Sequence, residues 1–345
     1  MTNKLVFAVV AIFGSALAGT PAQAAPSYYV TCLDCGFGSD LTPSAINSAG
    51  VVVASSSSLA RGVVLDHGAT LILPTLGGNW ATATAINDLG VVVGTSTTAT
   101  SPRKTAYAWA AGTMTSLGML PGAADGAISD AQAINAAGQI VGYATNTVGE
   151  QDAFFYSAGA MTDIGTLPGG VATFPTGINA WGHVSGSSVR GMDDSYHAFL
   201  FRNGQMIDLN PNASLAYSYA WGVNDADQVV GTTGALTGST VRFQAVLWIK
   251  GVRHALPAVT GYQGSSFGFG LNNKGWAVGQ TCNQNGHCVA YVYNRKKSLN
   301  LNSLLDSSGA GWTLNNAVAI NDAGVITGDG TFNGKSQVFL ATPIN

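Results

Sequence analysis

Seven near-copies of one ten-residue pattern constrain the fold of this chain more than any other feature. The pattern reads AINDLGVVVG at positions 85 to 94, and its asparagine recurs at intervals of 40 to 49 residues. The seven asparagines are Asn47, Asn87, Asn135, Asn179, Asn224, Asn272 and Asn321. Asn followed three residues later by Gly is typical of a tight turn between antiparallel strands, with Gly adopting a positive φ. A repeat of roughly 46 residues is in the range for one four-stranded propeller blade.

Two positions around each turn carry only small side chains. Ala or Gly stands two residues before every asparagine, and Gly stands seven residues after it in six copies, with Ala54 in the first copy. We expect both positions to be small because strands from all blades converge near a central axis. In the fifth copy Asp227 replaces the turn glycine, and Asp is among the few other residues that tolerate positive φ.

A second, aromatic pattern follows most copies, as in TAYAW, DAFFY and HAFLF, and a short turn then leads to a last strand such as MTDIG. Each unit therefore contains four strands. The seventh unit ends after its aromatic strand, whereas residues 28 to 34 form a last strand that no earlier strands precede. Pairing of these two ends would remove exposed sheet edges. We predict an all-β fold, a single seven-bladed β-propeller of four-stranded blades over residues 25–345, closed by the N-terminal strand on the last blade.

The first 24 residues have the features of a secretory signal peptide. Lys4 precedes a short apolar run, and Ala22-Gln23-Ala24 has the small-x-small form of a cleavage site. No later segment is long and apolar enough to span a bilayer. The sequence thus predicts a secreted protein, either extracellular or periplasmic, without a membrane span, and we expect it to be a monomer.

Composition and cysteine content limit the classes of partner and of cysteine site that we expect. Only 9% of residues are charged, 45 are glycine, and the formal net charge is -3, so no basic stripe is present for nucleic acid. In an oxidising compartment the four cysteines favour disulfides, most simply Cys32 with Cys35 and Cys282 with Cys288, although four cysteines allow three pairings. A zinc site or a redox CxxC at Cys32 and Cys35 is disfavoured.

Several of these motifs together resemble the bacterial extracellular HAF-repeat proteins. The resemblance rests on the AIN..G.VVG unit, on MTDIGTLPGG, and on His197-Ala198-Phe199, which stands here as the tripeptide HAF. It covers essentially the whole chain after residue 24 and implies secreted repeat proteins of propeller type whose function is largely unassigned. It implies no catalytic residue. Only one of the seven units keeps the histidine before Ala-Phe.

Signatures of catalysis or cofactor binding are scarce. No two histidines have the spacing of a metal site, and no GxSxG, Walker or calcium-loop motif is present. We therefore predict no metal, no cofactor and no catalytic residue. The turn asparagines are interpreted as turn caps rather than as a ligand ring. Asp193 and Asp194, in the densest polar cluster, are the acids that would serve an alternative function, an extracytoplasmic polysaccharide hydrolase or lyase.

The remaining candidate site is the face formed by the loops between strands two and three and between blades. Aromatic and charged residues in these non-repeating loops suit recognition of a sugar or a peptide. We predict a non-enzymatic recognition or scaffold protein that binds a glycan or an extracellular protein there. The candidate ligand-binding residues are Trp80, Arg190, Asp193, Asp194, Tyr262 and Trp312.

Overall fold

The computed structural model describes residues 27–37, 40–191, 195–211, 217–237 and 240–344. The predicted signal peptide and the Asp193-Asp194 pair lie outside these residues. The described chain is all-β, with strands connected by turns and loops and two short 3-10 turns, η1 (Leu301–Leu304) and η2 (Ser307–Gly309). No helix in this part of the chain is long and apolar enough to cross a membrane.

The first twelve strands after β1 form three antiparallel sheets of four strands in sequence order. The first three sheets contain β2 (Leu41–Ile46), β3 (Val52–Ser56), β4 (Arg61–Asp66) and β5 (Ala69–Ile72); β6 (Gly77–Ile86), β7 (Val92–Thr98), β8 (Thr105–Ala110) and β9 (Thr113–Gly118); and β10 (Ser129–Ile134), β11 (Ile140–Thr145), β12 (Gln151–Ser157) and β13 (Ala160–Gly165). In each sheet the order along the sheet is the order along the chain. Within each of these sheets, every strand therefore pairs with the strand that follows it in the chain, as the repeat predicts.

The next eight strands belong to one hydrogen-bonded sheet. They are β14 (Gly170–Ile178), β15 (Val184–Arg190), β16 (Tyr196–Arg202), β17 (Gln205–Asp208), β18 (Tyr217–Val223), β19 (Val229–Thr237), β20 (Thr240–Ile249) and β21 (Val252–Ala255). A single parallel pairing, of Tyr196 with Tyr217, joins β16 to β18. The antiparallel pairings on either side of this link again run over four consecutive strands each.

The last two sheets bring the chain ends together. One contains β22 (Ser266–Leu271), β23 (Ala277–Cys282), β24 (Cys288–Tyr293) and β25 (Ser298–Asn300), and the other β26 (Trp312–Ile320), β27 (Ile326–Phe332), β28 (Lys335–Ile344) and β1 (Ser27–Cys32). The N-terminal strand β1 pairs antiparallel with β28, from Ser27 with Ile344 to Cys32 with Phe339. This pairing is the one that the complementary ends of the sequence predict.

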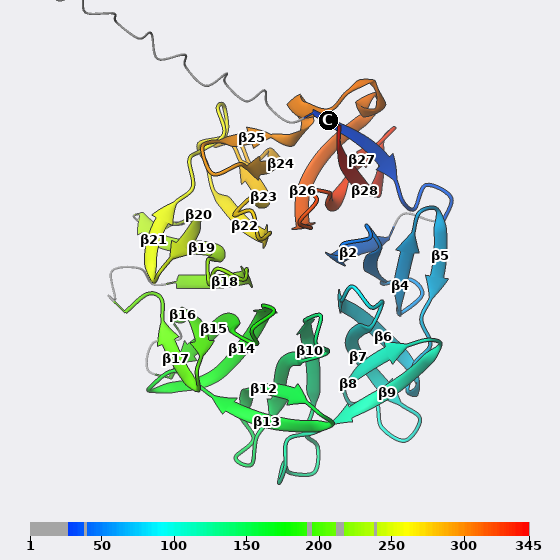
Figure 1. Ribbon diagram of the computed structural model, residues 1–345, viewed down its shortest axis with the longest axis vertical. Coiled ribbons are helices and arrows are strands. Elements are labelled where there is room, and N and C mark those ends of the chain that lie inside the picture. Colours follow the sequence, from blue (N-terminus) through cyan, green and yellow to red (C-terminus); the bar gives the residue numbers. More distant parts are fainter. Residues whose placement is uncertain (1–26, 38–39, 192–194, 212–216, 238–239, 345) are drawn as a thin grey trace, which may run out of the picture.

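The sheets are arranged around a central opening in the manner of a propeller (Figure 1). The strand that precedes each repeated asparagine lies innermost, and the last strand of each unit lies outermost. Turn chemistry agrees with the sequence analysis, because the turn glycines adopt positive φ, for example 75° at Gly90 and 73° at Gly275. Asp227 takes the same conformation, with φ of 55°.

The two small-residue positions have different physical causes. Two residues before the asparagine, a Cβ on Gly270 would lie 3.0 Å from the Cα of Ala319 in the next inner strand, so crowding between sheets is confirmed there. Seven residues after the asparagine the prediction is wrong. A Cβ on Gly279 would lie 1.9 Å from the carbonyl oxygen of Phe267 in its own sheet and 3.0 Å from the ring of Tyr291. This glycine makes room for a bulge and an aromatic side chain.

The aromatic pattern supplies much of the core. Tyr107, Phe154, Phe199 and Tyr291 are each at most 1% exposed, and burial of such side chains stabilises the fold by roughly 1.5–3 kcal/mol apiece. Two disulfides join Cys32 to Cys35 and Cys282 to Cys288. The simplest of the three possible cysteine pairings is thereby confirmed, and no zinc or dithiol site uses these residues.

Candidate functional site

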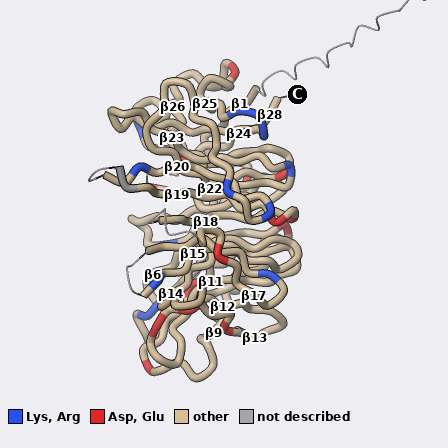
Figure 2. Tube along the Cα trace, turned by 90° about the vertical axis from the view of Figure 1, so that its left-hand side faces the viewer, with Lys and Arg blue, Asp and Glu red and all other residues tan. Residues whose placement is uncertain are grey.

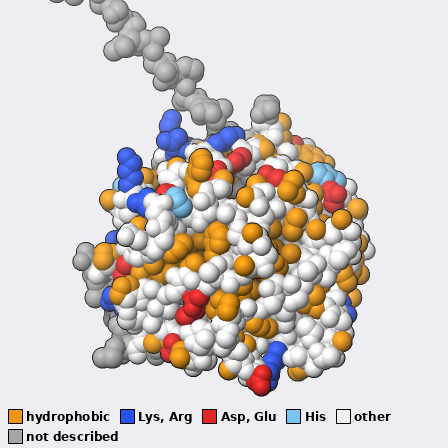
Figure 3. Space-filling model, turned by 60° about the horizontal axis from the view of Figure 1, so that its bottom comes forward, with side chains coloured by type: hydrophobic (Ala, Val, Ile, Leu, Met, Phe, Trp, Pro, Cys, Tyr) orange, Lys and Arg blue, Asp and Glu red, His pale blue; other side chains and the backbone are white. Residues whose placement is uncertain are grey.

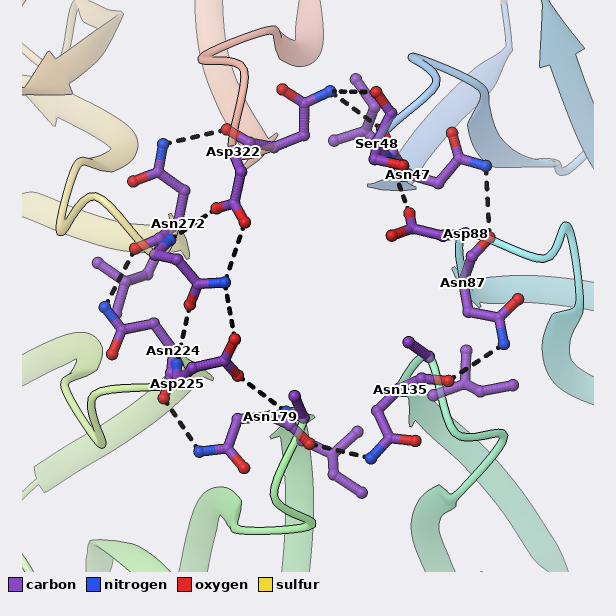
Figure 4. A pocket seen from close by; sticks show the side chains of 18 of the residues that line it. Asn47, Ser48, Asn87, Asp88, Asn135, Asn179, Asn224, Asp225, Asn272 and Asp322 are labelled. Carbon is purple, nitrogen blue, oxygen red and sulfur yellow. Dashed lines mark hydrogen bonds between the residues drawn. The ribbon is translucent and has the colours of Figure 1, made fainter.

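The seven turn asparagines form a cycle of hydrogen bonds around the central opening (Figure 4). The Nδ2 of Asn47 donates to the carbonyl oxygen of Asn87 at 3.3 Å, and each following asparagine donates in the same way to the next turn. Asn321 donates to the carbonyl oxygen of Asn47 at 3.0 Å, which returns to the first turn. The repeated asparagine therefore links neighbouring sheets.

The other end of each amide caps its own turn. The Oδ1 of Asn272, for instance, accepts from the backbone N–H groups of Lys274 at 3.1 Å and Trp276 at 3.0 Å, and the equivalent bond four residues on is present in all seven turns. All seven side chains are at most 7% exposed. Turn capping is confirmed, and little amide surface is left for a ligand.

A cavity of 310 Å³ lies on the axis at this end of the molecule, lined by the seven asparagines and the residues on either side of each. Three of these residues are acidic, Asp88, Asp225 and Asp322. Asp225 accepts from the backbone N–H of Ala180 at 2.9 Å, and Asn273 donates to Asp225 at 2.8 Å and to Asp322 at 2.9 Å. These polar side chains hydrogen-bond to groups within the cavity lining, which favours a structural role for the residues that line the axial cavity.

The described candidate residues from the sequence, Trp80, Arg190, Tyr262 and Trp312, lie at the opposite end of the sheets but in different sheets. Trp80 is half-buried near the start of β6, with Lys104 Nζ 5.8 Å from its ring centroid. Arg190 ends β15, and its backbone N–H donates to Ser195 at 2.9 Å. Asp193 and Asp194 lie outside the described residues, so the structure does not place them beside Arg190.

The other two candidates differ in their surroundings. Trp312 stacks on Phe332 with ring centroids 4.9 Å apart and meets the buried Phe339 edge-on at 6.3 Å. It packs against a core cluster, as a residue that covers the core would. Tyr262 is also half-buried, but it lines a cavity next to charged side chains.

Sequence reasoning missed a connected group of aromatic rings on the first and third strands of neighbouring units. Seven rings on β16, β18, β20 and β22 form one network of contacts, with the centroids of contacting rings 5.1–6.4 Å apart. We call this the aromatic tract. Its members are Tyr196, Tyr217, Tyr219, Trp221, Phe243, Phe267 and Phe269.

Every ring of the tract is partly accessible, and Trp221 is 40% exposed. Burial raises the pKa of Tyr219, with a smaller contribution from Tyr196. In three of the other units the position of Trp221 carries a hydroxyl that bonds the next inner strand, as when Thr176 donates to the carbonyl oxygen of Ala220 at 2.8 Å. The alternating aromatics of YSYAW and SFGFG were the available signal.

A second cavity, of 240 Å³, opens beside the tract between β20, β21 and β22. Its lining includes two arginines, Arg242 and Arg253, together with Gln244, Thr233, Phe243 and Tyr262. Arg242 donates to the carbonyl oxygen of Gln263, and Arg253 donates to Thr233 Oγ1 at 3.3 Å. We call this cavity the arginine pocket. Phe243 belongs both to it and to the aromatic tract.

The described histidines that pair with a carboxylate are interpreted as structural residues. His197 is 2% exposed and lies 2.9 Å from Asp208. Burial alone would raise the pKa of Asp227, but hydrogen bonds from His183 and Arg202 hold it below its ordinary value. No group of three or more His, Cys, Asp or Glu that could hold a metal ion occurs among the described residues.

Charge is sparse over the molecular surface. Lys, Arg, Asp and Glu are few and scattered along the trace (Figure 2), and the face in Figure 3 carries many hydrophobic side chains among uncharged ones, with isolated charges. Recognition by bulk charge is therefore not indicated. Two arginines in one cavity stand out against this background.

Comparison with known proteins supports the fold alone. No family model and no curated protein matches the chain. YCF48 bound to D1 peptide is similar in structure, with 10% identity, a TM-score of 0.53, and coverage of 94% of this chain and 99% of that chain. YCF48 from Cyanidioschyzon merolae has 8% identity and a TM-score of 0.50, with coverage of 91% and 99%. A virginiamycin B lyase from Staphylococcus aureus, at 12% identity, has a TM-score of 0.48 and coverage of 93% and 100%.

Proposed function

We propose that this chain is a secreted, non-enzymatic recognition protein of the HAF-repeat type that binds a glycan. It is a seven-bladed propeller, in which the eight-stranded sheet counts as two blades because a single residue pair joins its halves. The ring is closed by β1 on β28. The asparagine cycle supports closure, since an open stack would leave the amide of Asn321 without the turn at Asn47. Two disulfides fit the oxidising compartment of a secreted protein.

The aromatic tract is the observation that carries the binding proposal. Large apolar rings in a folded chain are usually buried, so a connected line of partly exposed rings marks an interaction surface. Sugar rings present flat faces of C–H groups that pack against aromatic rings, while their hydroxyls bond nearby polar groups. The tract begins at the end of the sheets where the sequence places the binding face, and runs along β18 toward Val223 in the axial cavity.

The proposal is tested with Trp221→Ala and a matched control, Trp181→Ala. Trp181 is 70% exposed in the turn after Asn179, where its indole N–H donates to the carbonyl oxygen of Asp225 at 3.0 Å, and among the described residues no ring contact joins it to the aromatic tract. We expect residues 25–345 to bind a subset of neutral and acidic oligosaccharides on a glycan array. Trp221→Ala should weaken binding by roughly tenfold, since loss of one ring contact is worth about 0.5–1.5 kcal/mol beyond the lost burial, and Trp181→Ala should leave it unchanged.

The same samples are then assayed for new reducing ends. Product release would overturn the non-enzymatic assignment in favour of a hydrolase or lyase, and Asp193→Asn and Asp194→Asn would then identify the acids. Absence of binding to every glycan would overturn the glycan assignment and leave an extracellular protein or peptide as ligand. Equal loss of binding in both tryptophan variants would remove the aromatic tract as the site.

A further inference from the structure

Building on the proposed glycan function, we infer that the arginine pocket binds the carboxylate of a uronic acid, so that the ligand is an acidic rather than a neutral polysaccharide. The pocket supplies two guanidinium groups, from Arg242 on β20 and Arg253 on β21. The chain has only 14 Lys and Arg in all. Two arginines facing one cavity are therefore a marked local concentration of positive charge.

Neither arginine is neutralised within the described part of the chain. The five ion pairs there involve other cations, and no acidic residue lines the pocket. Two like charges in one cavity repel, and an anion placed between them relieves that repulsion. The pocket is thus electrostatically suited to a negatively charged ligand.

Hydrogen-bonding capacity points to a planar anion. A guanidinium has five N–H donors in a fixed fork; Arg242 donates from one nitrogen to the carbonyl oxygen of Gln263, and Arg253 donates from one nitrogen to Thr233. These bonds hold both side chains in place and leave other N–H groups for a ligand. Arginine forks match carboxylates with paired, charge-assisted bonds.

Size and position restrict the ligand further. A volume of 240 Å³ is below the roughly 300–1,000 Å³ of sites that enclose a drug-sized ligand, so the pocket admits one charged unit rather than a chain. Phe243 and Tyr262 line the same cavity, and Phe243 contacts Phe267 of the aromatic tract at 5.4 Å. A sugar chain stacked on the tract would therefore direct one uronate into the pocket.

The test uses Arg242→Gln, Arg253→Gln and their double variant, with Arg295→Gln as control. Arg295 is exposed in the turn between β24 and β25 and also carries one charge. Binding of galacturonate, glucose and inorganic phosphate is followed through the Arg side-chain Nε–H signals in NMR spectra at 0.15 M salt. Calorimetry compares oligogalacturonate with a neutral oligosaccharide of equal length.

We expect galacturonate to shift the Arg242 and Arg253 signals and glucose to leave them unchanged. Each single variant should weaken oligogalacturonate binding by about tenfold or more, because it removes charge-assisted hydrogen bonds to the carboxylate. Arg295→Gln, and binding of the neutral chain, should show no change. Equal affinity for acidic and neutral chains, unaffected by the variants, would overturn this inference and leave the glycan function intact. Phosphate binding as tight as galacturonate would also overturn it, by showing a general anion site. If no oligosaccharide binds, the glycan function fails, and the galacturonate shifts still decide the pocket.

Discussion

Replacement of Asn272 by Asp separates the two roles of the repeated asparagine. The substituted carboxylate keeps an oxygen for the turn bonds from Lys274 and Trp276, at 3.1 and 3.0 Å. It loses the donor that reaches the carbonyl oxygen of Asn321 at 3.0 Å. The change therefore alters one link between neighbouring sheets and leaves the turn intact.

The size of the expected loss of stability follows from the burial of Asn272. Loss of one hydrogen bond costs about 1 kcal/mol. A carboxylate oxygen then faces a carbonyl oxygen at a site that is 3% exposed, which adds roughly 1–3 kcal/mol for incompletely solvated charge. We expect the free energy of unfolding to fall by about 2–4 kcal/mol at pH 7.5. At pH 4 a protonated carboxyl group can donate its O–H to Asn321, so the loss should shrink.

Asn283→Asp is the matched control. The Oδ1 of Asn283 accepts from Asn285 at 2.9 Å and from His287 at 3.1 Å in the same kind of turn, and its amide donates to no other group among the described residues. Urea unfolding of both variants is followed by tryptophan fluorescence at pH 7.5 and pH 4. Equal losses in the two variants, or a loss for Asn272→Asp that does not depend on pH, would refute the inter-sheet role of the amide.

Two further predictions concern the N-terminal segment, which comprises β1 and the residues directly after it. Burial raises the pKa of Asp34 to about 6, above its unfolded value, so the folded state holds the proton more tightly and stability falls as pH rises from about 4 to about 6. Asp34→Asn keeps an acceptor for the Val338 N–H. It should stabilise the fold on the order of 1 kcal/mol at pH 7 and give no gain at pH 4. Identical pH profiles of stability in urea unfolding of the variant and the parent would contradict this. Deletion of residues 28–34 removes the buried Tyr28 and Val30 and the strand that pairs with β28. It should lower the free energy of unfolding by at least about 4 kcal/mol. A deletion variant that melts like the parent would count against closure of the ring.

The repeat made the local structure predictable from the sequence. Turn position, positive φ at Gly90 and Asp227, and four strands per unit follow from short-range chemistry that each copy carries in full. The disulfides were predictable because each pair is three or six residues apart. The donation from each of the first six asparagines to a turn 40 to 49 residues away, and from Asn321 back to Asn47, was not predictable, since donor and acceptor meet only after the sheets have packed.

The site was less predictable because exposure of an aromatic side chain depends on tertiary packing. Trp312 was a candidate, but it lies against Phe332 and Phe339 and covers the core. Trp221 belongs to an alternating strand pattern that reads equally well as core, and only the structure shows it 40% exposed. Arg242 and Arg253 are 11 residues apart on neighbouring strands, and no spacing rule joins them.

A contrast between repeated and non-repeated positions also favours a ligand on the aromatic tract. Three residues before the turn asparagine, Ser44, Thr84 and Thr176 each donate a hydroxyl to a carbonyl of the next inner strand, at 2.7–3.0 Å. Trp221 and Phe269 take the same position in their own sheets and contact each other instead. These sheets give up a polar link between blades and leave apolar rings partly in water. Departures from a local rule without a gain in stability are expected where a chain binds something, and Phe269 is connected through Phe267 to Phe243, which lines the arginine pocket.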